Sequence, residues 1–215
     1  MTDGNLAHAL AEGLEALDLD LPPRASEQLL AFLSLLAEWN RAYNLTAVRD
    51  PLEMVRRHLL DSLTVLPHLR GGQIVDLGSG AGLPGIPLAI ADPDRQFILL
   101  ESNGKKVRFM RHAISQLGLS RVTVVQGRAE SVQLSPPPDT VVARAVADLA
   151  TLCGYARQLG APGVWLVAMK GPDVAAELAG VPADFAVQGV LPVVVPGLEA
   201  ARHLVCLRLM NGESD

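Results

Sequence analysis

Hydrophobic residues in the first 70 positions recur at the spacing of amphipathic helices and not of strands. Residues 6–17 and 26–39 each carry leucines on one helical face, and residues 40–49 interrupt this pattern. A further helix is predicted to start at residues 50–53, which read Asp-Pro-Leu-Glu. They supply an N-cap acid, a proline at the first helical position and a glutamate in the first turn. We therefore expect a helical region over residues 1–70.

After Gly71 and Gly72 the pattern changes to short apolar runs that alternate with helical segments, which is typical of a parallel sheet with crossover helices. Residues 185–195 and 203–209 are rich in β-forming residues with no helical pattern between them, so we expect an antiparallel pair there. Residues 71–215 are thus predicted to form a Rossmann-like α/β domain. The preceding strands are expected at Gln73–Leu77, Gln96–Glu101, Val122–Gln126, Thr140–Arg144 and residues 164–169.

The composition is typical of a protein from a reducing compartment. Among 215 residues there are two cysteines, Cys153 and Cys206, both in apolar surroundings, so neither a disulfide framework nor a metal site is expected. No run reaches the roughly 18 apolar residues of a membrane span, and the first residues lack the basic start and apolar core of a secretory signal. We expect a cytoplasmic monomer that has no membrane partner.

Charge is distributed unevenly along the chain, although the formal net charge is −5. Residues 102–121 carry five lysines and arginines and no acid, and Arg49, Arg56, Arg57 and His58 form a second basic cluster. Such clusters are able to bind phosphates, but each is equally compatible with a solvated helix face that acids balance elsewhere in the fold.

A glycine-rich turn follows the first predicted strand and leads into a helix with a proline in its first turn. Glycine allows the backbone to approach a ligand closely, and the start of a helix offers free N–H groups. Gly80-x-Gly82-x-x-Gly85 matches the fingerprint of dinucleotide-binding proteins. Asp76-x-Gly78-x-Gly80-x-Gly82 matches the signature of methyltransferases that bind S-adenosylmethionine. A nucleotide-type cofactor is expected with either pattern.

Polar residues at the ends of the next two strands favour an adenosine-type cofactor. Ligands of open α/β sheets lie beyond the carboxyl ends of the strands. Glu101 ends the second strand about 20 residues after the glycines, where an acid is able to accept both ribose hydroxyls. Ser102 and Asn103 offer further polar contacts. Ala129 and Glu130 follow the third strand, where a small residue and an acid are suited to an adenine ring and its amino group.

Matching segments along almost the whole chain make a family resemblance specific. The chain resembles the family called glucose-inhibited division protein B, or RsmG, whose members methylate a guanine at N7 in small-subunit (16S) ribosomal RNA. The terminal strand pair agrees with this, because it is typical of Rossmann-like class I S-adenosylmethionine-dependent methyltransferases and unusual for dehydrogenases. The matching segments include residues 39–46, 57–62, 78–87, 105–109, Arg144-Ala145, Lys170-Gly171 and 202–204.

The resemblance implies roles for individual residues. S-adenosylmethionine is expected at Gly78, Leu83, Glu101, Ser102, Asn103, Ala129, Glu130 and Arg144, and the glycine signature adds Asp76, Gly80 and Gly82. The family often carries another residue at position 129, which a backbone contact tolerates. The 16S ribosomal RNA, or the small ribosomal subunit, is the implied partner. Its expected contacts are Arg56, Arg57, Lys105, Lys106, Lys170 and Arg202.

Methyl transfer to guanine N7 needs positioning more than acid–base catalysis, because N7 already carries a free lone pair. No general base is therefore expected, and no Asn-Pro-Pro-Tyr motif for an exocyclic amine follows the fourth strand. Arg144, at the end of that strand, is the candidate catalytic residue, which would position the guanine or a phosphate. A structural ion pair of Arg144 with Asp148 or Glu130 is the alternative.

Two other residue pairs have competing interpretations. His58 and Asp61 have the spacing of metal ligands on a helix, but two residues alone seldom make a site, so a hydrogen-bonded pair that joins the helical region to the sheet is favoured. Trp39 and Tyr43 are able to stack on an RNA base. Their helical spacing favours a place in the core instead.

Three other functions remain compatible with the sequence. The dinucleotide fingerprint permits an NAD-dependent oxidoreductase. The methyltransferase signature also permits an enzyme that methylates a small molecule or a protein. An RNA-binding assembly factor that keeps the fold without catalysis is the third.

Overall fold

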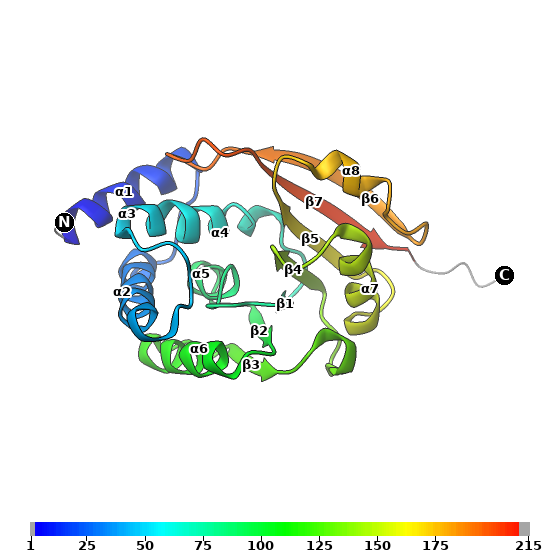
Figure 1. Ribbon diagram of the computed structural model, residues 1–215, viewed down its shortest axis with the longest axis horizontal. Helices are drawn as coiled ribbons and strands as arrows, with labels where there is room; N and C mark the ends of the chain where they lie inside the picture. The colour runs from blue at the N-terminus through cyan, green and yellow to red at the C-terminus, as the bar shows by residue number, and fades with distance from the viewer. Residues whose placement is uncertain (1–2, 211–215) are drawn as a thin grey trace.

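The computed structural model describes residues 3–210, which contain one seven-stranded sheet in the order β3-β2-β1-β4-β5-β7-β6 (Figure 1). The pairs among the first five strands are parallel, and β7 runs antiparallel to both β5 and β6. The strands are β1 (Gln73–Leu77), β2 (Gln96–Glu101), β3 (Val122–Gln126), β4 (Thr140–Arg144), β5 (Trp165–Lys170), β6 (Phe185–Val193) and β7 (Arg202–Leu209).

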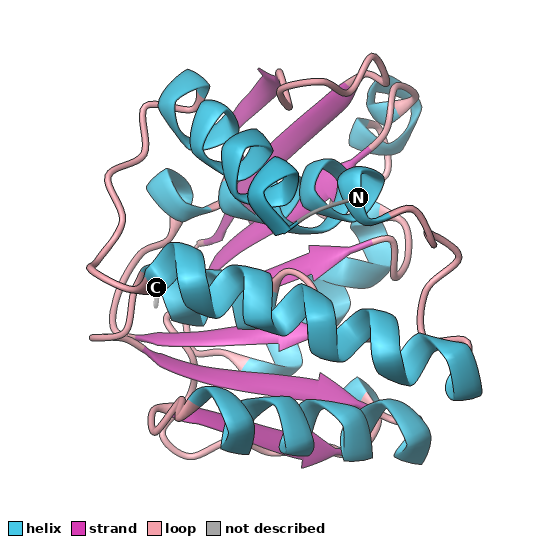
Figure 2. Cartoon of the chain, turned by 90° about the vertical axis from the view of Figure 1, so that its left-hand side faces the viewer, coloured by secondary structure: helices cyan, strands magenta, loops and turns pink. Residues whose placement is uncertain are grey.

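Helices cover both faces of this sheet, and the N-terminal helices lie in front of it in Figure 2. One face packs against α7 (Leu149–Leu159) and α8 (Val174–Leu178). The other packs against α5 (Gly85–Ala91) and α6 (Gly104–Leu117). A 3-10 turn, η3 (Ala129–Ser131), follows β3. The N-terminal part contains α1 (Asp3–Ala16), α2 (Ala25–Tyr43), α3 (Pro51–Met54), the π-helical turn η1 (Val55–Leu60), α4 (Asp61–Leu63) and the 3-10 turn η2 (Leu66–His68).

The expected Rossmann-like α/β fold is confirmed, and so is the terminal antiparallel pair. The predicted bounds of four parallel strands agree with the structure. Strand β5 begins and ends one residue later than expected, β6 ends two residues earlier, and β7 begins one residue earlier. The predicted helix start at residues 50–53 is also present, because the Asp50 carboxylate accepts from the Glu53 N–H at 2.9 Å. Within residues 3–210, no helix combines the length and the hydrophobicity that a membrane crossing requires.

Two features of the N-terminal part differ from the expectation. Helix α2 continues beyond residue 39 to Tyr43 and ends at Asn44, which adopts a left-handed conformation with φ of 49°. The turn after α3 is π-helical, so that the Asp61 N–H bonds to the Arg56 carbonyl and skips that of Arg57. Periodicity does not reveal such a turn, because it inserts a single residue into an otherwise helical segment.

The N-terminal helices and the methyltransferase-like part share one hydrophobic core. Leu10 of α1, Leu36 of α2 and Leu60 of η1 belong to the same buried cluster as Leu99 of β2 and Phe109 of α6. The division at residue 70 therefore lies within a single packed unit of structure, and a functional division there stays a prediction.

Phe109→Ala tests this shared core. The ring of Phe109 is fully buried and lies 6.2 Å from the ring of Phe32 and 5.7 Å from that of Trp39, both in α2. The substitution should lower the free energy of unfolding by about 3–5 kcal/mol, since it leaves a cavity between α2 and α6. Urea unfolding followed by circular dichroism should show a single transition. Separate transitions for the helices and the sheet would contradict a common core.

Candidate active site

The loop between β1 and α5 gives the site its shape. Gly78, Gly80 and Gly82 have φ values of 65°, 58° and 82°, a region that side chains other than glycine rarely adopt. A Cβ atom on Gly82 would also collide with Ile86 of α5, so only glycine allows the loop to lie this close to the helix. At Gly80 the nearest atoms to such a Cβ lie 3.9 Å away, so the loop is open on that side.

Asp76 holds this loop from below. The residue is 1% exposed, and its Oδ2 accepts from the Gly85 N–H at 2.8 Å, while the Ser79 hydroxyl donates to the Asp76 carbonyl. Oδ1 has no hydrogen-bond partner among residues 3–210. Burial raises the pKa of Asp76 to about 7, against the opposing effect of the Gly85 N–H. Asp76 lines neither of the clefts described below, so the structure places it under the loop that it supports.

Glu101 holds the loop from the end of the neighbouring strand. Its Oε2 accepts from the Gly80 N–H at 2.9 Å, and Oε1 accepts from the Asn103 N–H at 2.8 Å. The Asn103 side chain caps α6 by accepting from the Lys105 and Lys106 N–H groups. The parallel register of β1 and β2 brings these acids and the glycines to one edge of the sheet.

Two clefts open along this edge and meet at Gly78. The smaller has a volume of about 150 Å³ and is lined by Leu77, Gly78, Leu100, Glu101, Ser102, Gly127, Arg128, Ala129, Glu130, Val146 and Tyr155. The larger has a volume of about 530 Å³ and is lined by Leu45, Thr46, Arg57, His58, Asp61, Gly78, Ser79, Gly80, Ala81, Leu83, Lys106, Arg144, Ala145, Met169, Lys170, Gly171 and Arg202.

The smaller cleft contains five of the residues expected at a cofactor, Gly78, Glu101, Ser102, Ala129 and Glu130. Glu130 is exposed, and its Oε1 accepts from the Tyr155 hydroxyl at 2.9 Å. Its own backbone N–H and this hydroxyl hold the pKa of Glu130 below its usual value, so the carboxylate is charged at neutral pH. The cleft therefore offers two carboxylates that are able to accept from hydroxyl and amino groups.

The larger cleft is lined by five basic side chains, but most of them have partners. The Lys170 ammonium bonds to Glu177 and to the Ala147 carbonyl, both at 2.6 Å, and its side chain is 10% exposed. Two protein partners therefore already hold the Lys170 ammonium. Arg57 pairs with Glu53 at 2.7 Å. Lys106 has no ion-pair partner among the residues that the structure describes.

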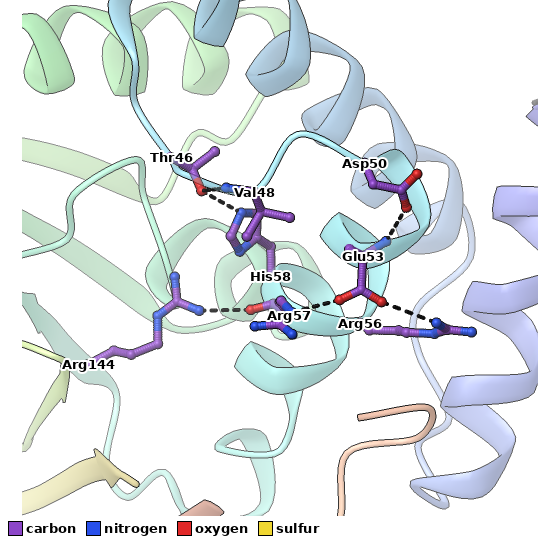
Figure 3. A network of polar contacts seen from close by, with 8 residues as sticks. All are labelled: Thr46, Val48, Asp50, Glu53, Arg56, Arg57, His58 and Arg144. Carbon is purple, nitrogen blue, oxygen red and sulfur yellow. Dashed lines mark hydrogen bonds and ion pairs between the residues drawn. The ribbon is translucent and has the colours of Figure 1, made fainter. Parts of the chain in front are cut away.

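Arg144 points into the larger cleft from the end of β4 (Figure 3). Its Nη1 donates to the Arg57 carbonyl at 3.0 Å and to Asp61 Oδ2 at 3.2 Å. The two structural partners considered from the sequence are wrong. Asp148 instead caps α7 by accepting from the Thr151 N–H, and Glu130 bonds to Tyr155.

His58 lies beside Arg144 and does not bond to Asp61, which corrects the expected pair. Its Nε2 shares a hydrogen bond of 2.9 Å with the Thr46 hydroxyl (Figure 3), and Nδ1 is buried without a partner in the described part of the chain. Burial and the charge of Arg144 lower the pKa of His58 to about 4, so the ring is neutral near pH 7. Residues 3–210 contain no group of three or more His, Cys, Asp or Glu side chains arranged for a metal ion.

Some predicted residues lie outside both clefts. Arg56 pairs with Glu53 at 3.2 Å, and Lys105 lies at the start of α6. Trp39 is half-buried and packs against Phe109 and His112, whereas Tyr43 is 42% exposed. The expected place in the core is therefore confirmed for Trp39 and wrong for Tyr43.

Several residues of the larger cleft received no cofactor-binding or RNA-binding role from the sequence. They are Leu45, Thr46, His58, Asp61, Ser79, Ala81, Ala145, Met169 and Gly171. Most of them lie in the segments that carry the family resemblance, and this was the feature of the sequence that could have identified them. Cys153 and Cys206 are free, buried and absent from the clefts, and burial raises the pKa of Cys153 to about 11.

Asp76→Asn tests the buried carboxyl group. The folded protein keeps the Asp76 proton to a higher pH than the unfolded chain does, so the free energy of unfolding should fall as the pH rises from about 4 to about 7. The variant lacks this group, so its free energy of unfolding should rise relative to that of the wild type by up to about 1.4 kcal/mol per pH unit in this range. Urea unfolding at pH 5 and pH 7.5 measures the difference. Parallel behaviour of the two proteins would show that Asp76 titrates normally.

A solved methyltransferase shares the fold of this chain. The SAM-dependent methyltransferase from Aquifex aeolicus has a TM-score of 0.57 at 18% sequence identity, and the match covers 78% of this chain and 97% of that one. At this identity the likeness shows a common Rossmann-like architecture and nothing about the substrate.

Sequence comparison is more specific. The GidB family model, which stands for rRNA small subunit methyltransferase G, matches residues 25–205. Ribosomal RNA small subunit methyltransferase G of Pseudomonas syringae pv. syringae is 46% identical over 202 residues, and that of Xanthomonas campestris pv. campestris is 50% identical over 201 residues. Each match covers 94% of this chain and 94% of the relative. The chain therefore belongs to the GidB family of small-subunit ribosomal RNA methyltransferases.

Proposed function

We propose that this protein transfers a methyl group from S-adenosylmethionine to the N7 atom of a guanine in small-subunit ribosomal RNA. The observation that carries this proposal is the pair of clefts that meet at Gly78, one lined by two glutamates and the other by basic residues. The names of the relatives support ribosomal RNA as the substrate.

The residues of the smaller cleft fit an adenosine. Glu101 would hold the ribose hydroxyls, with Ser102 and Asn103 beside it, and Ala129 and Glu130 would hold the adenine. The loop residues Gly78, Gly80, Gly82 and Leu83, together with Arg144, would hold the amino-acid part of the cofactor, which supplies the methyl group. The open space at Gly80 leaves room for such a close approach.

A dinucleotide fits the same loop less well. The fingerprint depends on free N–H groups at the start of the helix after the loop, where a pyrophosphate would accept. Here the Gly85 N–H already donates to the Asp76 carboxyl group, so an acid occupies that position. The structure therefore favours a cofactor without phosphate over NAD.

The chemistry of the larger cleft suits a nucleophile that needs no activation. Guanine N7 attacks through its own lone pair, so the protein has to orient the base and exclude water. His58 is neutral there, and neither cysteine reaches the cleft, which disfavours the covalent mechanism of pyrimidine C5 methylation. Arg144 would be the residue that positions the target nucleotide.

We assign contact with the RNA mainly to the N-terminal part, residues 1–70, and cofactor binding to residues 71–215. Leu45, Thr46, Arg57 and His58 line the larger cleft from the N-terminal side. Lys105 and Lys106 on α6, Arg56 on η1 and Arg202 on β7 would add attraction for phosphates. The pairing of Lys170 with Glu177 supports only a minor role for that lysine. The protein would act as a cytoplasmic monomer.

Glu101→Gln tests the cofactor assignment. The variant keeps the size of the side chain but replaces a charged acceptor, so binding of S-adenosylhomocysteine should weaken by about 1–3 kcal/mol. Isothermal titration calorimetry measures the affinity. Glu27→Gln is a matched control, because Glu27 is exposed on α2 far along the chain from both clefts. Equal affinities for wild type and Glu101→Gln would refute the ribose assignment.

The substrate is tested in cells that lack the gene. Their small-subunit ribosomal RNA should lose one N7-methylguanosine, which nuclease digestion and mass spectrometry would reveal. Complementation with the wild-type gene should restore the modification, and complementation with Arg144→Ala should not. Unchanged N7-methylguanosine in the deletion strain would refute this choice of substrate.

A further inference from the structure

Asp61 joins two arginines that come from different strands. It is 4% exposed, and its Oδ2 lies 3.2 Å from Arg144 Nη1 while Oδ1 lies 3.3 Å from Arg202 Nε. Arg144 ends β4 and Arg202 begins β7, and these strands lie on either side of β5 in the sheet. All three side chains line the larger cleft.

The π-helical turn η1 gives Arg144 a second anchor. Because the Asp61 N–H bonds to the Arg56 carbonyl, the carbonyl of Arg57 is free to accept from Arg144 Nη1 at 3.0 Å (Figure 3). One helical segment therefore presents a carboxylate and a carbonyl to the same guanidinium. π-helical turns inside helices are frequently found at functional sites.

The charges around Asp61 leave an excess of one positive charge. Asp61 supplies one negative charge to two guanidinium groups, the nearby His58 is neutral, and Lys170 is balanced by Glu177. Arg144 Nε and Nη2 and Arg202 Nη2 have no hydrogen-bond partner within residues 3–210. Two oriented guanidinium groups with free donors match the geometry of a phosphate, which accepts several N–H groups at once.

We propose that Asp61 is a positioning residue that holds Arg144 and Arg202 as one clamp for the phosphate of the target nucleotide. This inference rests on the proposed function and adds the contact that fixes the nucleotide beside the methyl group. Without the carboxylate the two guanidinium groups would repel each other and separate. A neutral guanine O6 needs a single donor pair and gains less from a second arginine, so the excess charge favours the phosphate.

Asp61→Asn tests the positioning role, since it keeps the size of the side chain but leaves one arginine without an acceptor. The kcat for methylation of small-subunit ribosomal RNA should fall at least about tenfold, because misplacement of reacting groups is costly. Affinity for the RNA should not fall, because the cleft gains positive charge. Asp61→Glu, which restores the charge, should recover part of the kcat.

Asp184→Asn is the matched control. It removes a carboxylate that forms two hydrogen bonds of 2.7 Å with Arg157, outside both clefts, and should leave kcat within about twofold of the wild type. If Asp61→Asn keeps the wild-type kcat, the proposal is overturned. If its kcat and RNA affinity fall together with its melting temperature, while Asp61→Glu recovers nothing, Asp61 is merely structural and the proposal is likewise overturned.

A binding measurement tests the clamp independently of catalysis. In the presence of S-adenosylhomocysteine, NMR titration should show that wild type binds guanosine 5′-monophosphate about tenfold more tightly than guanosine, and that Arg202→Gln removes this preference. Equal binding of the two ligands by wild type would overturn the phosphate clamp. If the wild type prefers guanosine 5′-monophosphate but methylates no ribosomal RNA, the clamp would be supported and the proposed function refuted.

Discussion

The site depends on the hydrogen bonds that two acids on β1 and β2 accept from the loop between β1 and α5 and from the start of α5. Asp76 accepts from Gly85 and Glu101 accepts from Gly80, so the start of α5 and the middle of the loop are fixed to the sheet. A loop of positive-φ glycines has high conformational entropy in the unfolded chain, and these bonds offset part of the cost of ordering it. Both clefts meet at this loop, so its position determines the shape of both.

The second constraint is the shared core between the N-terminal helices and the sheet. Leucines of α1 and α2 pack in the same cluster as β2 and α6, which fixes η1 relative to the strand ends. Because η1 is held there, Asp61 reaches arginines on β4 and β7. The helices thus form one wall of the larger cleft, and the sheet and its loops form the other.

Much of the fold follows from the sequence, because buried parallel strands are continuous apolar runs with polar ends. The helix start at Asp50 was also predictable, since capping depends on neighbouring residues alone. The end of α2 was not, because Asn40 is buried and accepts from the Thr46 N–H, a contact that allows the helix to continue. Hydrophobic periodicity does not predict the π-helical turn either.

The candidate site was predictable to a different extent in its two halves. The acids of the smaller cleft lie at strand ends, and topology places strand ends together. In the larger cleft the partners of each charge depend on tertiary packing. Arg144 pairs with Asp61, 83 residues away, and not with the nearby Asp148, and Lys170 is neutralised by Glu177 on α8. Residue type and spacing do not encode such pairs.

Transfer of a labelled methyl group tests the central claim most directly. Purified protein would be incubated with S-adenosylmethionine carrying a ¹³C-labelled methyl group and with small ribosomal subunits from cells that lack the gene. The account predicts one labelled N7-methylguanosine per subunit, identified by mass spectrometry of the digested RNA. Label at another atom or nucleotide, or no label in RNA from either assembled subunits or free small-subunit RNA, would contradict it.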